Sequence, residues 1–263
     1  MPTKGIVFYT DNRLDPKIAN MVQANLRKIA DEKDMPIVCS SLKKMNFGDK
    51  NIFFPSLRRG SVTMFKQIYS ALENSTSDII YFCEHDVLYP PCHFDFTPPE
   101  KRHYYYNEHV WKMEVGDKTA MRHYCSQTSG LCAYREVLLA HYKKRLEMYA
   151  KYFDELGGNR GVPVKFDGYK KSTGYEPGRY LTVHEEGTKY QHAHYIKGLI
   201  DKFGASTWQS EVPLIDIKHK DCLTASFWKL TVYRNRTYLQ GYKISDTIPG
   251  WGKVEEISKC LQH

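Results

Sequence analysis

The sequence predicts an α/β fold, in which a single domain is built on a mixed, mostly parallel central sheet and has a variable C-terminal part. Three apolar runs, at residues 5–10, 36–42 and 79–83, have the length and composition of buried strands. Two amphipathic segments, at residues 16–31 and from Ser61 onward, separate these runs. Strands that alternate with helices are joined by right-handed crossovers, so this order of elements predicts parallel strands.

The first strand and the first helix have clear boundaries. Residues 5–10 are followed by Asp11-Asn12, which is typical of a buried strand with a functional loop at its C-terminal end. Asp15 is a good N-cap residue, and Pro16 suits the first helical position. We therefore expect a helix over residues 16–31.

The later elements are less regular. Ser61 is expected to cap a helix, because apolar residues repeat after it at helical spacing. Residues 104–106 and 110–113 suggest a pair of strands, and a long amphipathic helix over residues 135–156 should stop at Gly157-Gly158. The remaining expected segments are a glycine-rich loop or short hairpin over residues 157–190 and a buried strand over residues 212–217.

The composition is that of a globular protein. Hydrophobic residues make up 41% and charged residues 26%, which excludes fibrous and disordered classes. The longest apolar stretch, Ile79–Cys83, is far shorter than the ~20 residues of a membrane span, so we expect none. The N-terminal apolar run is too short for a secretory leader, which indicates a cytoplasmic protein. Seven cysteines without a Cys-x-x-Cys pair are interpreted as reduced thiols.

Polar residues of metal-ligand type stand at two predicted strand ends. Glu84, His85 and Asp86 follow one buried strand, and His219 follows another. Ligands of open α/β sheets bind beyond the carboxyl ends of the strands, where a carboxylate can hold Mg²⁺ or Mn²⁺ on phosphate oxygens. The alternatives are a polar turn for the first group and an ordinary surface histidine for the second.

These residues and the order of elements resemble the GT-A fold, a Rossmann-like fold of nucleotide-sugar glycosyltransferases, over roughly residues 5–225. The motif Glu84-His85-Asp86 looks like the family's Asp-x-Asp signature, with Glu in place of the first Asp. Arg58-Arg59-Gly60-Ser61 is similar to the turn that introduces the helix before that signature. The resemblance implies a nucleotide-sugar-binding half at residues 1–95, an acceptor half at residues 96–225 and a C-terminal lid or tail at residues 226–263.

The resemblance also implies an activity and a set of site residues. The expected protein is a metal-dependent glycosyltransferase that uses a nucleoside diphosphate sugar, with UDP-sugar as the expected donor. Asp86 and His219 would hold Mn²⁺ or Mg²⁺ on the diphosphate. The residues implied to bind the donor are Tyr9, Thr10, Asp11, Asn12, Arg59, Glu84 and His85.

The catalytic base is left open between acidic residues about ninety positions after the signature. Glu176, in Tyr175-Glu176-Pro177-Gly178, is favoured because a Pro-Gly turn can hold a carboxylate at a fixed place. Glu185, in the pair Glu185-Glu186, is the alternative. A retaining enzyme needs no such base, and the stereochemistry stays open.

The acceptor is also open. The net charge of +8 favours a polyanion, such as a hydroxymethylated pyrimidine in DNA, which would place a phage-encoded enzyme in its host's cytoplasm. An envelope glycan or lipid is the alternative acceptor. Two rival functions are a nucleotidyltransferase, which usually carries a glycine-rich loop that residues 9–13 lack, and a nucleic-acid-binding module without metal dependence.

Overall fold

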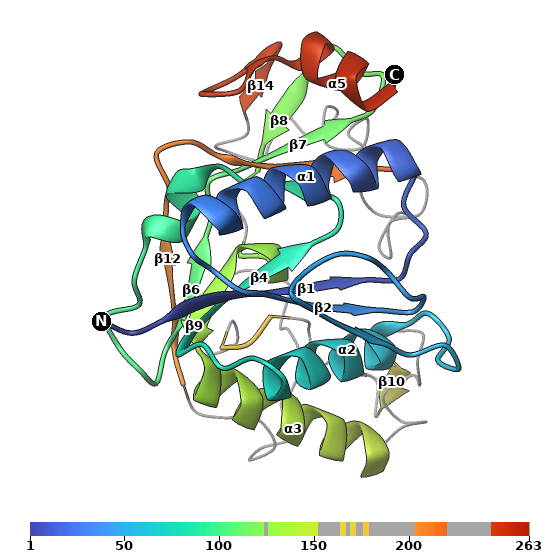
Figure 1. Ribbon diagram of the computed structural model, residues 1–263, viewed down its shortest axis with the longest axis vertical. Coiled ribbons are helices and arrows are strands. Elements are labelled where there is room, and N and C mark those ends of the chain that lie inside the picture. The colour runs from blue at the N-terminus through green and yellow to red at the C-terminus, as the bar shows by residue number, and fades with distance from the viewer. Residues whose placement is uncertain are drawn as a thin grey trace.

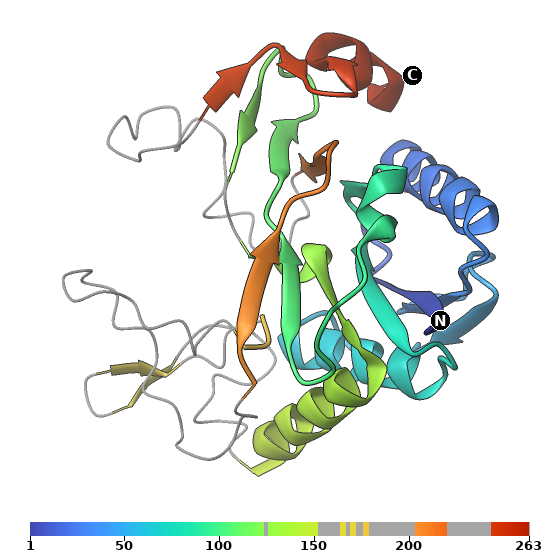
Figure 2. The same cartoon turned by 90° about the vertical axis from the view of Figure 1, so that its left-hand side faces the viewer.

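The computed structural model describes residues 1–123, 126–151, 164–166, 169–171, 176–178, 203–219 and 243–262. It has a mixed α/β architecture with a central sheet, a second sheet and helices on both faces of the central sheet (Figures 1 and 2). The predicted fold class, α/β with a mostly parallel central sheet, is confirmed. The assignment of the whole chain to one glycosyltransferase domain stays a prediction.

The central sheet has seven strands in the order β12-β6-β9-β4-β1-β2-β3. Only β9 runs antiparallel to its neighbours, and the other pairs are parallel. The carboxyl ends of β4, β1 and β2 therefore meet at one edge. The strands are β1 Lys4–Thr10, β2 Ile37–Ser41, β3 Lys50–Phe53, β4 Ile79–Glu84, β6 Tyr104–Asn107, β9 Leu131–Tyr134 and β12 Ala205–Trp208.

Helices cover both faces of this sheet. Helix α1 (Pro16–Glu32) lies on one face, and α2 (Ser61–Glu73) and α3 (Arg135–Lys151) lie on the other (Figure 1). Asp15 caps α1 as predicted, since its carboxylate accepts a hydrogen bond from the backbone N–H of Lys17 at 2.9 Å. The capping role predicted for Ser61 is wrong, because Gly60 occupies the N-cap of α2 and Ser61 is already helical.

The second sheet has five strands in the order β14-β8-β7-β13-β5. Strand β13 runs parallel to β7 and antiparallel to β5. The predicted pairing of residues 104–106 with residues 110–113 is wrong, because these residues form β6 and β7, which belong to different sheets. The strands are β5 Val87–Leu88, β7 Val110–Glu114, β8 Ala120–Arg122, β13 Leu214–Lys218 and β14 Lys243–Ser245.

Shorter elements complete the described residues. The predicted hairpin within residues 157–190 is present as the antiparallel pair β10–β11, whereas the predicted end of the long helix at residues 152–158 lies outside the described residues. Near the C-terminus, α5 packs on α1, and the indole N–H of Trp251 donates to the carbonyl of Pro213 at 2.7 Å. The elements are η1 Pro91–Asp95, η2 Thr128–Gly130, β10 Val164–Phe166, β11 Tyr169–Lys171, β15 Thr247–Ile248, β16 Gly252–Lys253 and α5 Val254–Gln262.

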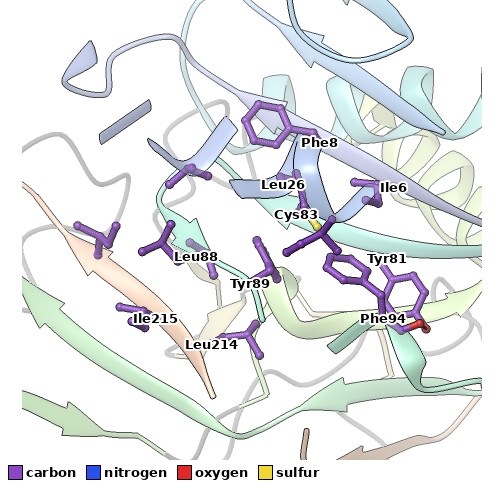
Figure 3. Packing of buried hydrophobic residues seen from close by; sticks show 14 of the residues in the cluster. Ile6, Phe8, Leu26, Tyr81, Cys83, Leu88, Tyr89, Phe94, Leu214 and Ile215 are labelled. Atoms are coloured by element: carbon purple, nitrogen blue, oxygen red, sulfur yellow. Dashed lines mark hydrogen bonds between the residues drawn. The ribbon is translucent and has the colours of Figure 1, made fainter. Parts of the chain in front are cut away.

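Two apolar clusters sandwich the central sheet. Phe8 of β1 and Cys83 of β4 point to the α1 side, where they pack with Leu26 (Figure 3). Val7 and Phe82 point to the opposite side, toward α2 and α3. Each large side chain buried in this way stabilises the fold by about 1.5–3 kcal/mol. None of the described helices is long and apolar enough to cross a membrane.

Candidate metal and donor site

The site lies where β1 and β4 end side by side. These strands are parallel neighbours, and Tyr9 is in register with Glu84. The two loops that follow, Thr10-Asp11-Asn12 and His85-Asp86, therefore emerge at the same sheet edge. This is the position at which open α/β sheets bind their ligands.

Three side chains in this region form a group with the spacing of metal ligands. One ligand atom from each of His85, Asp86 and His219 lies within 4.8 Å of the others. The Nε2 of His219 is 3.3 Å from Oδ2 of Asp86. His219 is far away in the sequence, but β13 brings it close because the backbone N–H of Ile217 donates to the carbonyl of Asp86 at 2.8 Å.

The two carboxyl groups of the signature have opposite electrostatic environments. Burial alone would raise the pKa of Asp86, but a hydrogen bond from His219 and the charges of His85 and Lys218 bring it well below its usual value. Burial and the nearby charge of Asp86 raise the pKa of Glu84 instead. Asp86 therefore ionises more readily than Glu84, which makes it the better ligand for a cation.

Glu84 is not part of this group. Its Oε1 accepts a hydrogen bond from the hydroxyl of Tyr9 at 2.5 Å. The three-residue ligand group therefore contains the second and third residues of the signature and not the first. The donor-binding roles expected for Tyr9 and Glu84 stay predictions.

The residues after β1 are linked to the metal-ligand group. The hydroxyl of Thr10 lies 2.6 Å from Nδ1 of His85. Asp11 forms an ion pair with Arg59, with Oδ2 at 2.5 Å from the guanidinium Nε, and its Oδ1 is 3.8 Å from His85. The predicted residues Thr10, Asp11, Arg59 and His85 are thus brought together in one polar chain.

Asn12 shapes the loop. Its φ of 60° places it in the left-handed region, which asparagine tolerates better than most residues. Its Oδ1 accepts hydrogen bonds from the backbone N–H groups of Leu42 and Lys43, both at 2.8 Å. The side chain therefore ties the end of β1 to the end of β2.

Gln67 was not singled out from the sequence. Its buried amide donates to the carbonyls of Thr10 at 2.8 Å and Ser40 at 3.2 Å, so α2 clamps the ends of two strands. On a helical wheel Gln67 falls opposite the predicted apolar stripe of Val62, Phe65, Tyr69 and Leu72, so the hydrophobic pattern gave no signal for its burial.

Of the candidate bases, only Glu176 lies within the described residues. The turn at residues 176–178 packs on the edge of the central sheet, where the hydroxyl of Tyr106 donates to the carbonyl of Pro177 at 2.5 Å. Gly178 has a φ of 70°, and a Cβ there would come within 2.5 Å of the ring of Tyr104. This turn is therefore held in place, while the role of Glu176 stays a prediction. Glu185 and Glu186 lie outside the described residues.

Comparisons with known proteins give fold-level likeness only. No family model and no curated protein matches the chain. Among solved structures, a glycosyltransferase involved in glycosylation of the major capsid of PBCV-1 aligns with a TM-score of 0.40 and 9% identity, over 60% of this chain and 73% of that chain. The catalytic domain of Drosophila beta1,4-galactosyltransferase 7 with xylobiose aligns with a TM-score of 0.33 and 13% identity, over 55% of this chain and 52% of that chain.

A mutant of the same Drosophila enzyme, in complex with manganese, UDP-Gal and xylobiose, aligns with a TM-score of 0.34 and 11% identity, over 63% of this chain and 58% of that chain. Structural likeness this weak supports no argument about individual residues or substrates. The chemistry of the site has to be inferred from this chain's own residues.

Proposed function

We propose that the protein is a metal-dependent glycosyltransferase that takes its sugar from a nucleoside diphosphate sugar, with UDP-sugar as the donor. The observation that carries this proposal is the group His85, Asp86 and His219 at the end of β4, directly beside the polar end of β1. A cation held there lies next to side chains able to bind the rest of a nucleotide.

The ligand types fit Mn²⁺ better than Mg²⁺. One carboxylate and two imidazoles are offered, whereas Mg²⁺ prefers oxygen ligands throughout. The same set also suits Zn²⁺ and Fe²⁺, so titrations should include both. When bound, the cation would neutralise the negative charge that develops on the departing diphosphate.

His85 is suited to ligation through its contact with Thr10. A histidine that binds a metal usually donates its second ring N–H to a neighbouring oxygen. Nδ1 of His85 lies 2.6 Å from the Thr10 hydroxyl, and in the tautomer in which Nδ1–H donates to that oxygen, Nε2 keeps its lone pair for the cation. The Thr10 oxygen also accepts from the backbone N–H of Asn12 at 3.0 Å, which fixes its direction.

The neighbouring ion pair is suited to the nucleoside. Arg59 holds Asp11, and a carboxylate with one oxygen turned toward Arg59 can accept N–H or O–H groups of a base or ribose on its remaining lone pairs. The hydrogen bond between Tyr9 and Glu84 would hold the ends of β1 and β4 together. The side chain of Asn12 would hold the end of β2 to the end of β1.

An inverting transfer needs a base that takes the proton of the acceptor hydroxyl. The acceptor oxygen forms a bond to the anomeric carbon, and the bond from that carbon to the diphosphate oxygen breaks with its electron pair leaving on the nucleoside diphosphate. The proton of the acceptor hydroxyl goes to Glu176, or to Glu185 in the alternative. The held turn around Pro177 supports the choice of Glu176.

The proposed acceptor is a hydroxyl on a polyanion, with a hydroxymethylated pyrimidine in DNA as the specific candidate. The supporting observation is the net charge of +8. Incubation with nucleotide sugar and hydroxymethylated DNA, followed by nucleoside analysis, should show a hexose mass increment that is absent with unmodified DNA. Transfer only to an envelope glycan or lipid would exclude the DNA acceptor and leave the glycosyltransferase proposal in place.

The activity itself is tested with a panel of nucleotide sugars in Mn²⁺, with products identified by mass spectrometry. A glycosyltransferase releases nucleoside diphosphate from at least one donor. Release of pyrophosphate from a nucleoside triphosphate would instead identify a nucleotidyltransferase. His219→Gln should lower this activity. His103→Gln is its matched control and should keep the activity, because residue 103 precedes β6 at the opposite edge of the sheet.

A further inference from the structure

Three exposed basic side chains lie in the loops that follow β1 and β2. Arg13 comes after β1, and Lys43 and Lys44 come after β2. Within the part of the chain that the structure describes, none of these three side chains forms an ion pair. The loops emerge on the same side of the molecule as the first turn of α1 (Figure 1).

The acidic residues of these loops do not neutralise the three cations. Asp11 pairs with Arg59, and the carboxylate of Asp15 caps α1. Even when Asp15 is counted in full, its single negative charge stands against three positive charges, so positive charge is in excess on this surface.

The acidic residues at the metal site are too far away to change this balance. Glu84 and Asp86 lie at the end of β4, and the strand order β4-β1-β2 puts that end two strands away from β2. At the usual spacing of strands this separation is about 10 Å, which exceeds the Debye length of ~8 Å at physiological salt.

Hydrogen bonds hold the basic residues together at the edge of the sheet. The side chain of Asn12 accepts from the backbone N–H of Lys43 at 2.8 Å, which ties the loop with Arg13 to the loop with Lys43. The backbone N–H of Met45 donates to Oδ1 of Asn51 at 3.2 Å, so the second loop lies against β3. The three cations are therefore carried by loops of fixed position.

An exposed aromatic ring lies beside the two lysines. Phe53, the last residue of β3, is 45% exposed. It is in register with Ser41 of β2, and the hydroxyl of Ser41 donates to the carbonyl of Lys43 at 2.5 Å. Proteins that bind single-stranded nucleic acids combine cations, which contact the phosphates, with aromatic faces on which bases stack.

We infer that the surface formed by Arg13, Lys43, Lys44 and Phe53 binds single-stranded DNA and holds the strand that receives the sugar. This inference rests on the proposed function, because it gives the proposed DNA acceptor a place on the protein. A single strand fits better than a duplex, since its base faces are open to stacking and its target base need not be extracted. At about 10 Å from the end of β4, the surface can hold neighbouring nucleotides while the target hydroxyl reaches the metal site.

The test is the fluorescence anisotropy of a labelled oligothymidylate mixed with the full chain in EDTA, without donor. Lys43→Gln/Lys44→Gln should weaken binding and reduce the slope of log affinity against log salt by about 1.4, because each cation on a single strand contributes ~0.7. Phe53→Ser should weaken binding about tenfold, as expected for one lost stacked base, and should leave the salt slope unchanged. Heparin, a polyanion without bases, should lose affinity for the lysine variant but not for Phe53→Ser.

Two variants serve as matched controls. Lys101→Gln/Arg102→Gln removes two exposed cations that precede β6 at the opposite edge of the sheet. Ile244→Ser removes a side chain that is 47% exposed, from β14. Both should bind oligothymidylate like the wild type, and UDP binding in Mn²⁺ should be unchanged in all four variants.

The outcomes separate this inference from the proposed function. Wild-type affinity for oligothymidylate in both the lysine variant and Phe53→Ser, or sugar transfer to hydroxymethylated DNA that both variants retain in full, would overturn the inference alone. An effect of the lysines without any effect of Phe53 would also overturn it, since the surface would then bind any polyanion. Oligothymidylate binding that depends on the lysines and on Phe53, without sugar transfer from any donor, would overturn the proposed function alone.

Discussion

His93 is expected to make the stability of the protein fall in mild acid. Its side chain is fully buried and stacks on Trp208, with ring centroids 5.3 Å apart. Its Nδ1 accepts a hydrogen bond from the amide of Asn107 at 3.0 Å, and among the described residues its Nε2 has no hydrogen-bond partner. Burial lowers the pKa of His93 from 6.5 to about 3.

The size of the effect follows from that shift. Between pH 6.5 and about 3 the unfolded chain binds a proton at this position and the folded protein does not, so the free energy of unfolding falls as the pH is lowered. Above pH 6.5 the neutral His93 side chain carries no penalty, and the free energy of unfolding has its full value. Each pH unit below that value removes about 1.4 kcal/mol, so a change from pH 7.5 to pH 5 removes about 2 kcal/mol.

Urea unfolding of the wild type and of His93→Phe at both pH values measures this directly. Phenylalanine keeps an aromatic ring against Trp208 and cannot titrate, so the variant should lose about 2 kcal/mol less than the wild type on acidification. His103→Phe, in which a more exposed histidine is replaced, should behave like the wild type. Equal pH dependence in the wild type and His93→Phe would refute the assignment.

Three further predictions concern the site. Gln67→Met removes two hydrogen bonds to strand-end carbonyls and should lower the free energy of unfolding by about 1–3 kcal/mol, as measured by urea unfolding; no loss would show that the clamp is dispensable. Thr10→Val removes the hydroxyl that orients His85 and should weaken Mn²⁺ binding about tenfold to a hundredfold in calorimetry, while an unchanged affinity would exclude His85 Nε2 as a ligand supported in this way. Glu176→Gln should reduce turnover by about 10²–10⁴ with donor affinity retained, and near-normal turnover would transfer the role to Glu185 or remove it.

The parts of the fold that sequence patterns predicted are those buried on both sides. The runs that became β1, β2 and β4 are continuous and apolar because helices cover both faces of the sheet. Strand β3 was missed because Lys50 and Phe53 are exposed at the edge of the sheet, so its pattern is mixed. The hydrophobic pattern also does not specify which strand a given strand pairs with. The sequence therefore suggested that β6 and β7 pair with each other, although they belong to different sheets.

The candidate site was predicted only as far as strand ends could be located. Asp86 and His219 could be proposed as one site because each follows a buried strand, and ligands bind beyond such strand ends. The contact that brings them together could not be predicted, because it depends on β13 pairing with β5, which directly follows Asp86. Lys112, whose Nζ lies 3.5 Å from Oδ2 of Asp216, gave no signal of its burial. A lysine within an apolar segment has the same appearance whether it is buried beside a carboxylate on a neighbouring strand or reaches solvent.

The most direct test of the proposed metal site is calorimetric titration of UDP in the presence and absence of Mn²⁺ with the wild type, Asp86→Ala and His219→Ala. The wild type should bind UDP more tightly with Mn²⁺ than without it, and the difference should disappear in both variants while their circular dichroism spectra stay unchanged. His103→Ala should keep the difference. A Mn²⁺ dependence of equal size in the wild type and both variants, or none in the wild type, would contradict the assignment of the donor site to Asp86 and His219.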